Sequence, residues 1–213
     1  MTERAFLELR YFRMRNGPQV DRTTAYLRDV WLPEMQKAGA GPVGIFSSLI
    51  GPQNPTILTV VSREPLAVIS DTDFDADYMR MESSILKSFR TVPQIEAPKG
   101  GEHRVFELRT YESTNDRTLS RKIQMFEDGE ISIFRRCGIV PVFFGRTIIG
   151  RDQPNLTYMV TFDDLADRER AWRTFAADPE WQKLRATPGL TDAEIVSNVT
   201  SSIYRPLPFS PIH

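Results

Sequence analysis

Leu7-Glu8-Leu9-Arg10-Tyr11, near the start of the chain, returns 99 residues later as Phe106-Glu107-Leu108-Arg109-Thr110, followed by Tyr111. Three further landmarks keep this offset: Gly39 and Gly138, Ile50-Gly51 and Ile149-Gly150, and Pro55 and Pro154. Chance matches would scatter in offset, so one register kept over separated landmarks indicates an internal duplication. The 213 residues therefore divide into two copies of about a hundred residues each.

Each copy is predicted to contain a strand, a helix, a β-hairpin, a second helix and a closing strand. In the first copy the predicted segments are 6–14, 20–38, 45–50 with 56–62, 75–90 and 91–96. In the second copy they are 105–111, 119–136, 142–149 with 156–162, 165–186 and 195–204. Pro33 should break the first helix near Leu32, because proline lacks the amide hydrogen that a helix needs. The order is that of a ferredoxin-like β-α-β-β-α-β unit.

The predicted fold class is α+β, with two tandem ferredoxin-like domains at 1–98 and 102–213 and a linker at Pro98-Lys99-Gly100-Gly101. Such a unit carries both helices on one face of its antiparallel sheet and leaves the other face open. Two units in one chain can stack their open faces. We therefore expect a barrel or sandwich formed within a single chain.

The composition argues against several classes of partner. Lys plus Arg number 27 against 28 for Asp plus Glu, which leaves no basic surface for a phosphate backbone, so we expect no nucleic acid. No apolar run reaches signal-peptide or membrane-span length, which predicts no membrane partner and a cytoplasmic location. Cys137 is the only cysteine, and His103 and His213 lack metal-ligand spacing. We therefore expect neither a metal nor a cofactor.

The two opening strands resemble those of the NIPSNAP family. Further likeness lies in Trp31-Leu32-Pro33-Glu34-Met35, in Asp178-Pro179-Glu180-Trp181-Gln182 and in the tail Leu207-Pro208-Phe209-Ser210-Pro211. The resemblance covers nearly the whole chain as two tandem copies. It implies a dimeric α+β barrel, made here within one chain. It implies no particular reaction, because the family has no generally assigned catalytic residues to carry over.

The candidate site residues come from the opening strands. Successive strand side chains alternate between faces, so Glu107, Arg109 and Tyr111 share one face and Phe106, Leu108 and Thr110 the other. If the apolar set packs under the helices, the charged set faces the space between the two sheets. Glu8 and Arg10 repeat this pattern in the first copy. The second copy adds Tyr111 where the first has Phe12, and Arg146 where it has Ser47.

Buried charges are costly unless they are paired, so the repeated Glu-x-Arg needs an explanation. One interpretation is a structural network in which Glu8, Arg10, Glu107 and Arg109 pair across the pseudo-twofold axis. Another is a pocket in which arginines hold an acidic or carbonyl-bearing ligand, while a glutamate, its pKa raised by burial, serves as a base. Glu107 and Tyr111 are then the catalytic candidates, and Arg109, Arg146, Arg10 and Glu8 the ligand-binding candidates. A third is that the faces are reversed and the charges lie in solvent.

Two functions follow. The first is binding of a small organic ligand in the barrel interior, with cofactor-independent monooxygenase or isomerase chemistry by analogy with the wider barrel group. The alternative is a noncatalytic interaction module with a filled barrel, in which the proline-rich tail 206–211 binds a protein or wraps over the other half. A homodimer is a further prediction. A lumen of several hundred Å³ favours a ligand, and a filled one favours the module.

Overall fold

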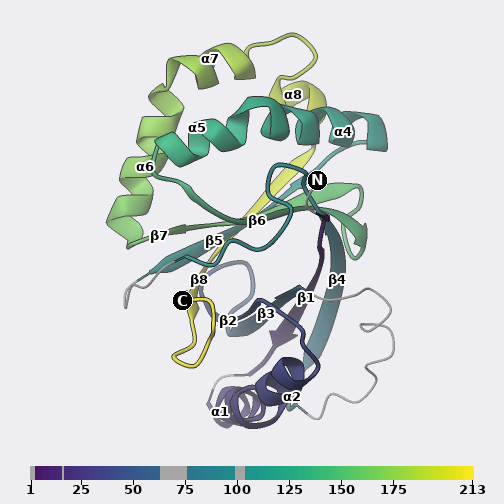
Figure 1. Cartoon of the computed structure of the whole chain (residues 1–213), viewed down its shortest axis with the longest axis vertical. Helices are drawn as coiled ribbons and strands as arrows, with labels where there is room; N and C mark the ends of the chain where they lie inside the picture. The colour runs from purple at the N-terminus through teal and green to yellow at the C-terminus, as the bar shows by residue number, and fades with distance from the viewer. Residues whose placement is uncertain (1–2, 16, 63–75, 99–103) are drawn as a thin grey trace.

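Eight antiparallel strands close into one barrel in a computed structural model that describes residues 3–15, 17–62, 76–98 and 104–213 (Figure 1). The strand order is β1-β3-β2-β8-β5-β7-β6-β4. The strands are β1 (Phe6–Arg13), β2 (Val43–Ile50), β3 (Thr56–Ser62), β4 (Arg80–Ser88), β5 (Val105–Glu112), β6 (Val140–Ile149), β7 (Asn155–Phe162) and β8 (Asn198–Pro206). The predicted α+β barrel is confirmed.

Closure comes from strand pairing between the two halves of the chain. The edge strand β2 of the first half pairs with β8, and β4 pairs with β6 of the second half. Each half thus supplies the partner that the other half's sheet edge lacks. This satisfies backbone groups that an open sheet would expose to other chains.

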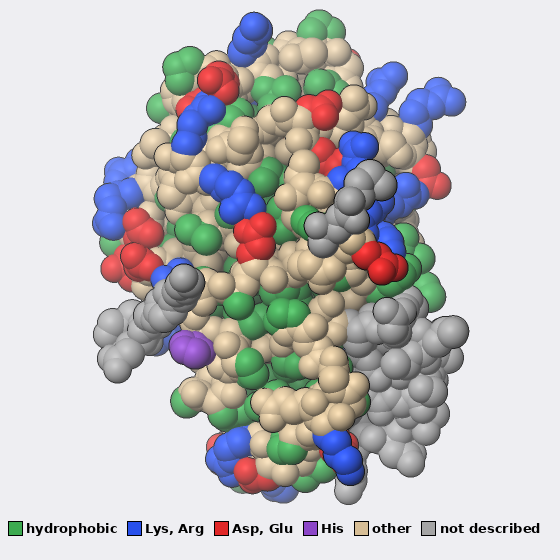
Figure 2. All heavy atoms as spheres, in the orientation of Figure 1, with side chains coloured by type: hydrophobic (Ala, Val, Ile, Leu, Met, Phe, Trp, Pro, Cys, Tyr) green, Lys and Arg blue, Asp and Glu red, His purple; other side chains and the backbone are tan. Residues whose placement is uncertain are grey.

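Helices cover the outside of the barrel (Figure 1). They are α1 (Pro18–Tyr26), η1 (Leu27–Trp31) and α2 (Leu32–Lys37) in the first half, and α4 (Asp116–Met125), η2 (Phe126–Glu130), α5 (Ile131–Arg136), α6 (Leu165–Ala177), α7 (Pro179–Arg185) and α8 (Asp192–Ile195) in the second. Within the described part of the chain, no helix combines the length and apolar character that a membrane crossing needs. In Figure 2 basic and acidic side chains lie interspersed on the face shown.

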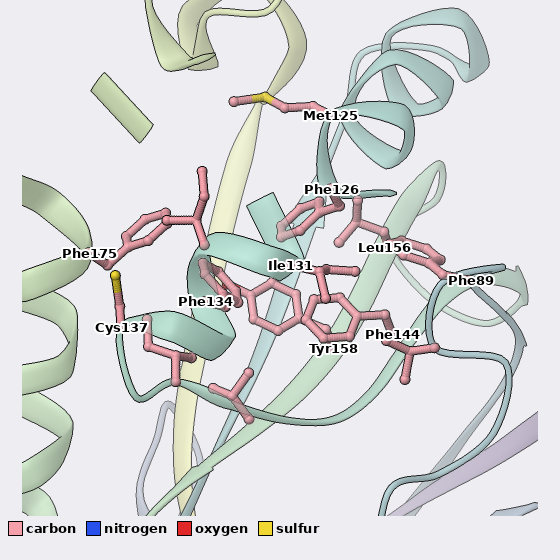
Figure 3. Packing of buried hydrophobic residues seen from close by; sticks show 14 of the residues in the cluster. Phe89, Met125, Phe126, Ile131, Phe134, Cys137, Phe144, Leu156, Tyr158 and Phe175 are labelled. Carbon is pink, nitrogen blue, oxygen red and sulfur yellow. The ribbon is translucent and has the colours of Figure 1, made fainter. Parts of the chain in front are cut away.

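Apolar side chains pack on both the inner and the outer face of the barrel wall. Inside the barrel, an apolar cluster includes Leu7, Leu9, Phe106 and Leu108. Outside, aromatic residues of the helices pack on β5, β6 and β7; Figure 3 shows Phe126 and Phe134 against Tyr158 and Phe144. The Phe144 and Tyr158 rings stack with centroids 4.8 Å apart. Cys137 is a buried member of this outer cluster.

The predicted end of the first half is wrong. Residues 80–88, expected in a helix, form strand β4, and residues 91–96, expected as a strand, form none. Residue 75, where that helix was predicted to begin, lies outside the described residues. At its C-terminal end β4 has buried residues on both faces. The sequence Ser84-Ile85-Leu86-Lys87-Ser88 therefore lacks the alternation of apolar and polar residues that identifies a half-exposed strand. Of the predicted linker, the structure describes Pro98 alone.

Both long helices contain a π-helical turn at the same place. Leu27–Trp31 and Phe126–Glu130 keep the 99-residue offset of the sequence repeat. The predicted break at Pro33 therefore begins earlier, at Leu27, and the second half has the same turn with Ser132 in place of proline. Proline is thus not its cause. Such π turns are rare and often accompany functional sites.

The C-terminal tail packs on the first half of the chain. The Leu207 amide donates to the Ile45 carbonyl, and the Ser210 hydroxyl accepts from the Ile45 amide at 2.9 Å. Ile212 is buried in the apolar cluster inside the barrel. The tail is therefore part of the fold and covers one end of the lumen.

Replacing Ser210 with alanine should lower the free energy of unfolding by about 1–3 kcal/mol, because the buried Ile45 amide loses its acceptor. Urea unfolding followed by circular dichroism measures the change. The matched control is Ser120→Ala on the exposed face of α4, which should stay within about 0.5 kcal/mol of wild type. Equal stabilities for both variants would show that the tail is not docked in solution.

Candidate functional site

The opening strand of the second half presents its charged face to the helices. Glu107 contacts Arg168 and Trp172 of α6, and Tyr111 packs with the outer cluster. Phe106 and Leu108 instead face the lumen. The predicted faces are therefore reversed, although the charges do not lie in solvent, because the helices bury them. Alternation identifies which residues share a face; here both faces carry apolar neighbours, so it could not identify the inner one.

Glu107 is fully buried and fully hydrogen-bonded. Its carboxylate accepts from Arg109 Nη1, Arg168 Nε and Nη2, Trp172 Nε1 and the Ser201 hydroxyl, at 2.8–2.9 Å. Burial acts to raise the pKa of Glu107, but the Arg168 hydrogen bonds and the Arg109 charge outweigh it and hold the pKa below its ordinary value. The predicted rise in pKa is wrong. Glu107 is an ionised anchor for the two arginines.

Arg109 connects this anchor to a pair of tyrosines. Its Nη2 donates to the Tyr111 hydroxyl at 3.1 Å, and the Tyr158 hydroxyl donates to the same oxygen at 3.3 Å. Burial raises the pKa of Tyr158 well above its ordinary value, so this phenol stays protonated. Among the residues described, the buried Nε of Arg109 finds no hydrogen-bond partner.

A buried lysine and glutamate adjoin the tyrosines. Lys122 Nζ on α4 lies 3.2 Å from a Glu130 carboxylate oxygen and 3.5 Å from Asp192 of α8. It also lies 4.9 Å from the centre of the Phe126 ring and 5.4 Å from that of Tyr111. Complete burial raises the pKa of Glu130 to about 7, although Lys122 opposes the shift.

We call Arg109, Tyr111, Lys122, Glu130 and Tyr158 the acid–base cluster. At the corresponding positions the first half has Arg10, Phe12, Thr23, Trp31 and Thr59. Trp31 and Phe12 are buried members of an apolar cluster there. A buried lysine and glutamate cost several kcal/mol relative to such packing unless they are well paired. At four of these five positions the second half thus has an ionisable group where the first half has none, and only the arginine is shared.

The other predicted site residues lie elsewhere. Glu8 and Arg10 form an ion pair with each other on β1. Arg146 pairs with Asp116 at the start of α4, 2.6 Å away. Glu107 pairs with arginines of its own half, so the predicted pairing of the two Glu-x-Arg motifs across the pseudo-twofold axis is wrong. The structure brings together Glu107, Arg109 and Tyr111 and separates them from the rest.

A cavity of about 120 Å³ opens at one end of the lumen, which we call the barrel mouth. Leu108 and Tyr204 belong both to its wall and to the apolar cluster that fills the lumen below. The remaining wall is mostly polar. Its hydroxyl groups come from Tyr11, Ser48, Ser84, Thr110, Thr147, Thr157, Thr200 and Ser202, and its side-chain amides from Gln53 and Asn155. Its charged residues are Arg13, Glu82, Glu112, Arg151 and Asp152. The lumen is therefore filled at one end and hollow and polar at the other.

Two phenols and an ion cluster converge in the barrel mouth. Burial raises the pKa of Tyr11, with a further contribution from Tyr204, and burial raises the pKa of Tyr204 to about 12. Both phenols are therefore neutral. Glu82 accepts from Arg13 Nε at 3.2 Å, from Arg13 Nη2 at 2.9 Å and from Arg151 Nη1 at 2.7 Å. These hydrogen bonds lower the pKa of Glu82, and the hydrogen bond from Arg13 contributes most.

Sequence reasoning missed both Glu130 with Lys122 and the barrel mouth. The repeat itself could have identified the first, because the 99-residue offset sets Glu130 against Trp31 and Lys122 against Thr23. The mouth residues come from several strands and turns of both halves and share no local motif. Within the part of the chain that the structure describes, no three His, Cys, Asp or Glu side chains group as a metal site.

The topology and the partly hollow lumen define an α+β barrel of the dimeric type, closed within one chain. Residues 106–211, in the second half of the chain, match the model of the NIPSNAP family. No curated protein matches the chain.

Several solved structures are similar to the chain. An uncharacterised NIPSNAP-like domain protein from Burkholderia xenovorans is 26% identical, with 51% of this chain and 90% of that chain covered and a TM-score of 0.46. A candidate monooxygenase from Lactobacillus acidophilus is 10% identical over 96% of this chain and 94% of its own, with a TM-score of 0.63. An anthrone oxidase-like protein is 9% identical over 96% and 92%, with a TM-score of 0.60. At these identities the last two support the fold alone.

Proposed function

We propose that this protein binds a small polar organic molecule in the barrel mouth. The observation that carries the proposal is a polar hollow at one end of a lumen that is otherwise filled, with the partly buried Tyr11 side chain in its wall. A ligand atom that enters this cavity can accept a hydrogen bond from the Tyr11 hydroxyl.

The size of the cavity sets the size of the ligand. Pockets for drug-sized molecules measure about 300–1,000 Å³, well above the 120 Å³ of the barrel mouth. A molecule of a few heavy atoms fits, and its outer end can extend into solvent. The alternative, an interaction module with a filled barrel, accounts for the apolar end of the lumen and leaves the polar end without a role.

Ligand-observed NMR with acetate, pyruvate, acetamide and glycerol tests the proposal. We expect at least one probe to bind the wild-type protein and Thr110→Phe to abolish the signal, because the larger ring fills the cavity. Tyr11→Phe should weaken binding about tenfold by removing one hydrogen bond. Thr174→Phe, on the exposed face of α6, is the matched control. Equal binding to Thr110→Phe and wild type would place the site outside the barrel mouth.

A second candidate function is a cofactor-independent monooxygenase or isomerase. The acid–base cluster favours it, because it occurs in one half alone and holds a carboxyl group with a pKa of about 7, suited to proton transfer near neutral pH. The cluster reaches the surface at Asp192, which is more than half exposed. The names of the two fold neighbours, a candidate monooxygenase and an anthrone oxidase-like protein, agree with this chemistry.

Oxygen uptake with an anthrone as substrate tests the enzymatic function. We expect uptake above the buffer rate, lowered about 10²-fold or more by Glu130→Gln, since a positioned acid or base contributes this much. Glu96→Gln, in an exposed ion pair with Arg135, should leave the rate unchanged. Equal rates for wild type and Glu130→Gln would show that the acid–base cluster takes no part in the reaction. Such a result would not contradict ligand binding in the mouth.

A further inference from the structure

The barrel mouth holds one carboxylate between arginines from the two halves of the chain. Arg13 lies at the end of β1, and Arg151 follows β6 in the second half. Both donate to Glu82 on β4. A third arginine, Arg80, lies 4.0 Å from the same carboxylate. With Asp152 near Arg151 and Glu112 in the wall of the mouth, the group holds three cations and three anions, so the arginines are balanced by carboxylates of the protein itself.

The side-chain groups of the barrel mouth that remain free to bind a ligand are hydrogen-bond donors. Arg13 Nη1 has no partner in the described ranges, since Nε and Nη2 alone donate to Glu82. Arginine has no acceptor atom at all. The Tyr11 side chain lines the same cavity, and its hydroxyl, which burial keeps protonated, is a further donor. A ligand that satisfies these donors must be rich in acceptor oxygens and, opposite arginines, negatively charged.

The volume limits that ligand to a few atoms. At about 120 Å³ the cavity is well below the roughly 300–1,000 Å³ of pockets that hold drug-sized molecules, so a molecule of a few heavy atoms suits it. Acids with two or three carbons meet this limit. Such a molecule can place a carboxylate at the arginines and a second oxygen at Tyr11.

We propose that the ligand of the barrel mouth is a small oxo- or hydroxycarboxylate, with its carboxylate held by Arg13 and Arg151 and its second oxygen accepting from Tyr11. The inference rests on the proposed function of the mouth as a ligand site. Glu82 acts as a built-in competitor, because its carboxylate occupies the arginines in the free protein. Arg151, with a side chain 57% exposed, is the partner that can turn to the ligand.

Isothermal titration with pyruvate and with glycerol, at low ionic strength, tests the proposal. We expect pyruvate to bind at least tenfold more tightly than glycerol. Arg151→Gln should weaken pyruvate binding about tenfold or more, and Glu82→Gln should tighten it several-fold by releasing both arginines. Arg135→Gln, in an exposed ion pair on α5, makes the same charge change away from the mouth and should have no effect. Circular dichroism confirms that each variant is folded.

The outcomes separate the ligand class from the ligand site. Glycerol binding as tightly as pyruvate, unaffected by Arg151→Gln but lost in Thr110→Phe, overturns the carboxylate class and preserves the mouth as a site. Weaker pyruvate binding in Glu82→Gln also overturns the class, since Glu82 would then hold the ligand. Failure of all four probes to distinguish wild type from Thr110→Phe overturns both. Arg151→Gln tests the class even if Glu82→Gln does not fold, because Arg151 lies at the surface.

Discussion

Replacing Glu107 with glutamine should lower the free energy of unfolding by about 3–5 kcal/mol at neutral pH. The substitution keeps the size of the side chain and removes its charge, so Arg109 and Arg168 lose their shared anion beneath the helices. The glutamine amide also turns two donor hydrogens toward groups that are themselves donors, among them Trp172 Nε1. A loss of this size is a large part of the about 5–15 kcal/mol that stabilises a typical domain.

Urea unfolding at two pH values measures this effect and its cause. The pKa of Glu107 is held below its ordinary value of 4.5, so its stabilising effect is present above that pH and is lost as the pH falls through the lowered pKa. The difference between wild type and Glu107→Gln should therefore shrink in acid. Glu96→Gln removes an exposed ion pair and should cost about 1 kcal/mol or less. A Glu107→Gln variant no less stable than this control would contradict the buried network.

The barrel could be predicted largely because the same sequence landmarks recur at an offset of 99 residues, which suggests two similar units. The strand-turn-strand signals place both hairpins within a few residues of β2, β3, β6 and β7. Strand β4 escaped prediction because both of its faces are buried at one end, where a strand reads like a helix. Its pairing with β6 depends on residues of the other half, which no local pattern of residues 80–88 contains.

The site was harder to predict than the fold. The grouping of Glu107, Arg109 and Tyr111 follows from alternation within one strand and is correct. Whether these side chains point into the lumen or toward the helices depends on which face of β5 lines the lumen. Leu108 and Tyr158 are both buried, one inside the barrel and one outside. The barrel mouth requires the closed topology, since Arg13 and Arg151 meet at Glu82 only after β4 pairs with both β1 and β6.

Replacing Lys122 with methionine should destabilise the protein in a strongly pH-dependent way. Lys122 is fully buried and donates to Glu130, whose carboxylate would then remain buried beside Arg109, Tyr111 and Tyr158 without its ammonium partner. Removing one partner of a buried pair costs about 3–5 kcal/mol when the other stays charged. Glu130 can avoid part of this cost by taking up a proton, so the loss should be smallest in acid.

The direction of the pH effect follows from the raised pKa of Glu130. In the wild type its contribution is complete below 4.5, its ordinary pKa, and declines as the pH rises through about 7. Without Lys122 the pKa of Glu130 rises further, so the decline should continue into alkaline pH at up to about 1.4 kcal/mol per pH unit. Urea unfolding near neutral pH and about two units on either side measures the slope.

A second substitution in the same pair tests the assignment. Lys122→Met combined with Glu130→Met removes both charges, and replacing a buried pair by apolar side chains of similar volume is often neutral or stabilising. The double variant should therefore regain most of the stability lost by Lys122→Met and lose its alkaline decline. If it is as unstable and as pH-dependent as the single variant, another group titrates and Lys122 does not pair with Glu130. If stability returns, the two charges are dispensable for folding, and their presence beside Tyr111 in one half of the barrel is explained by what they do there.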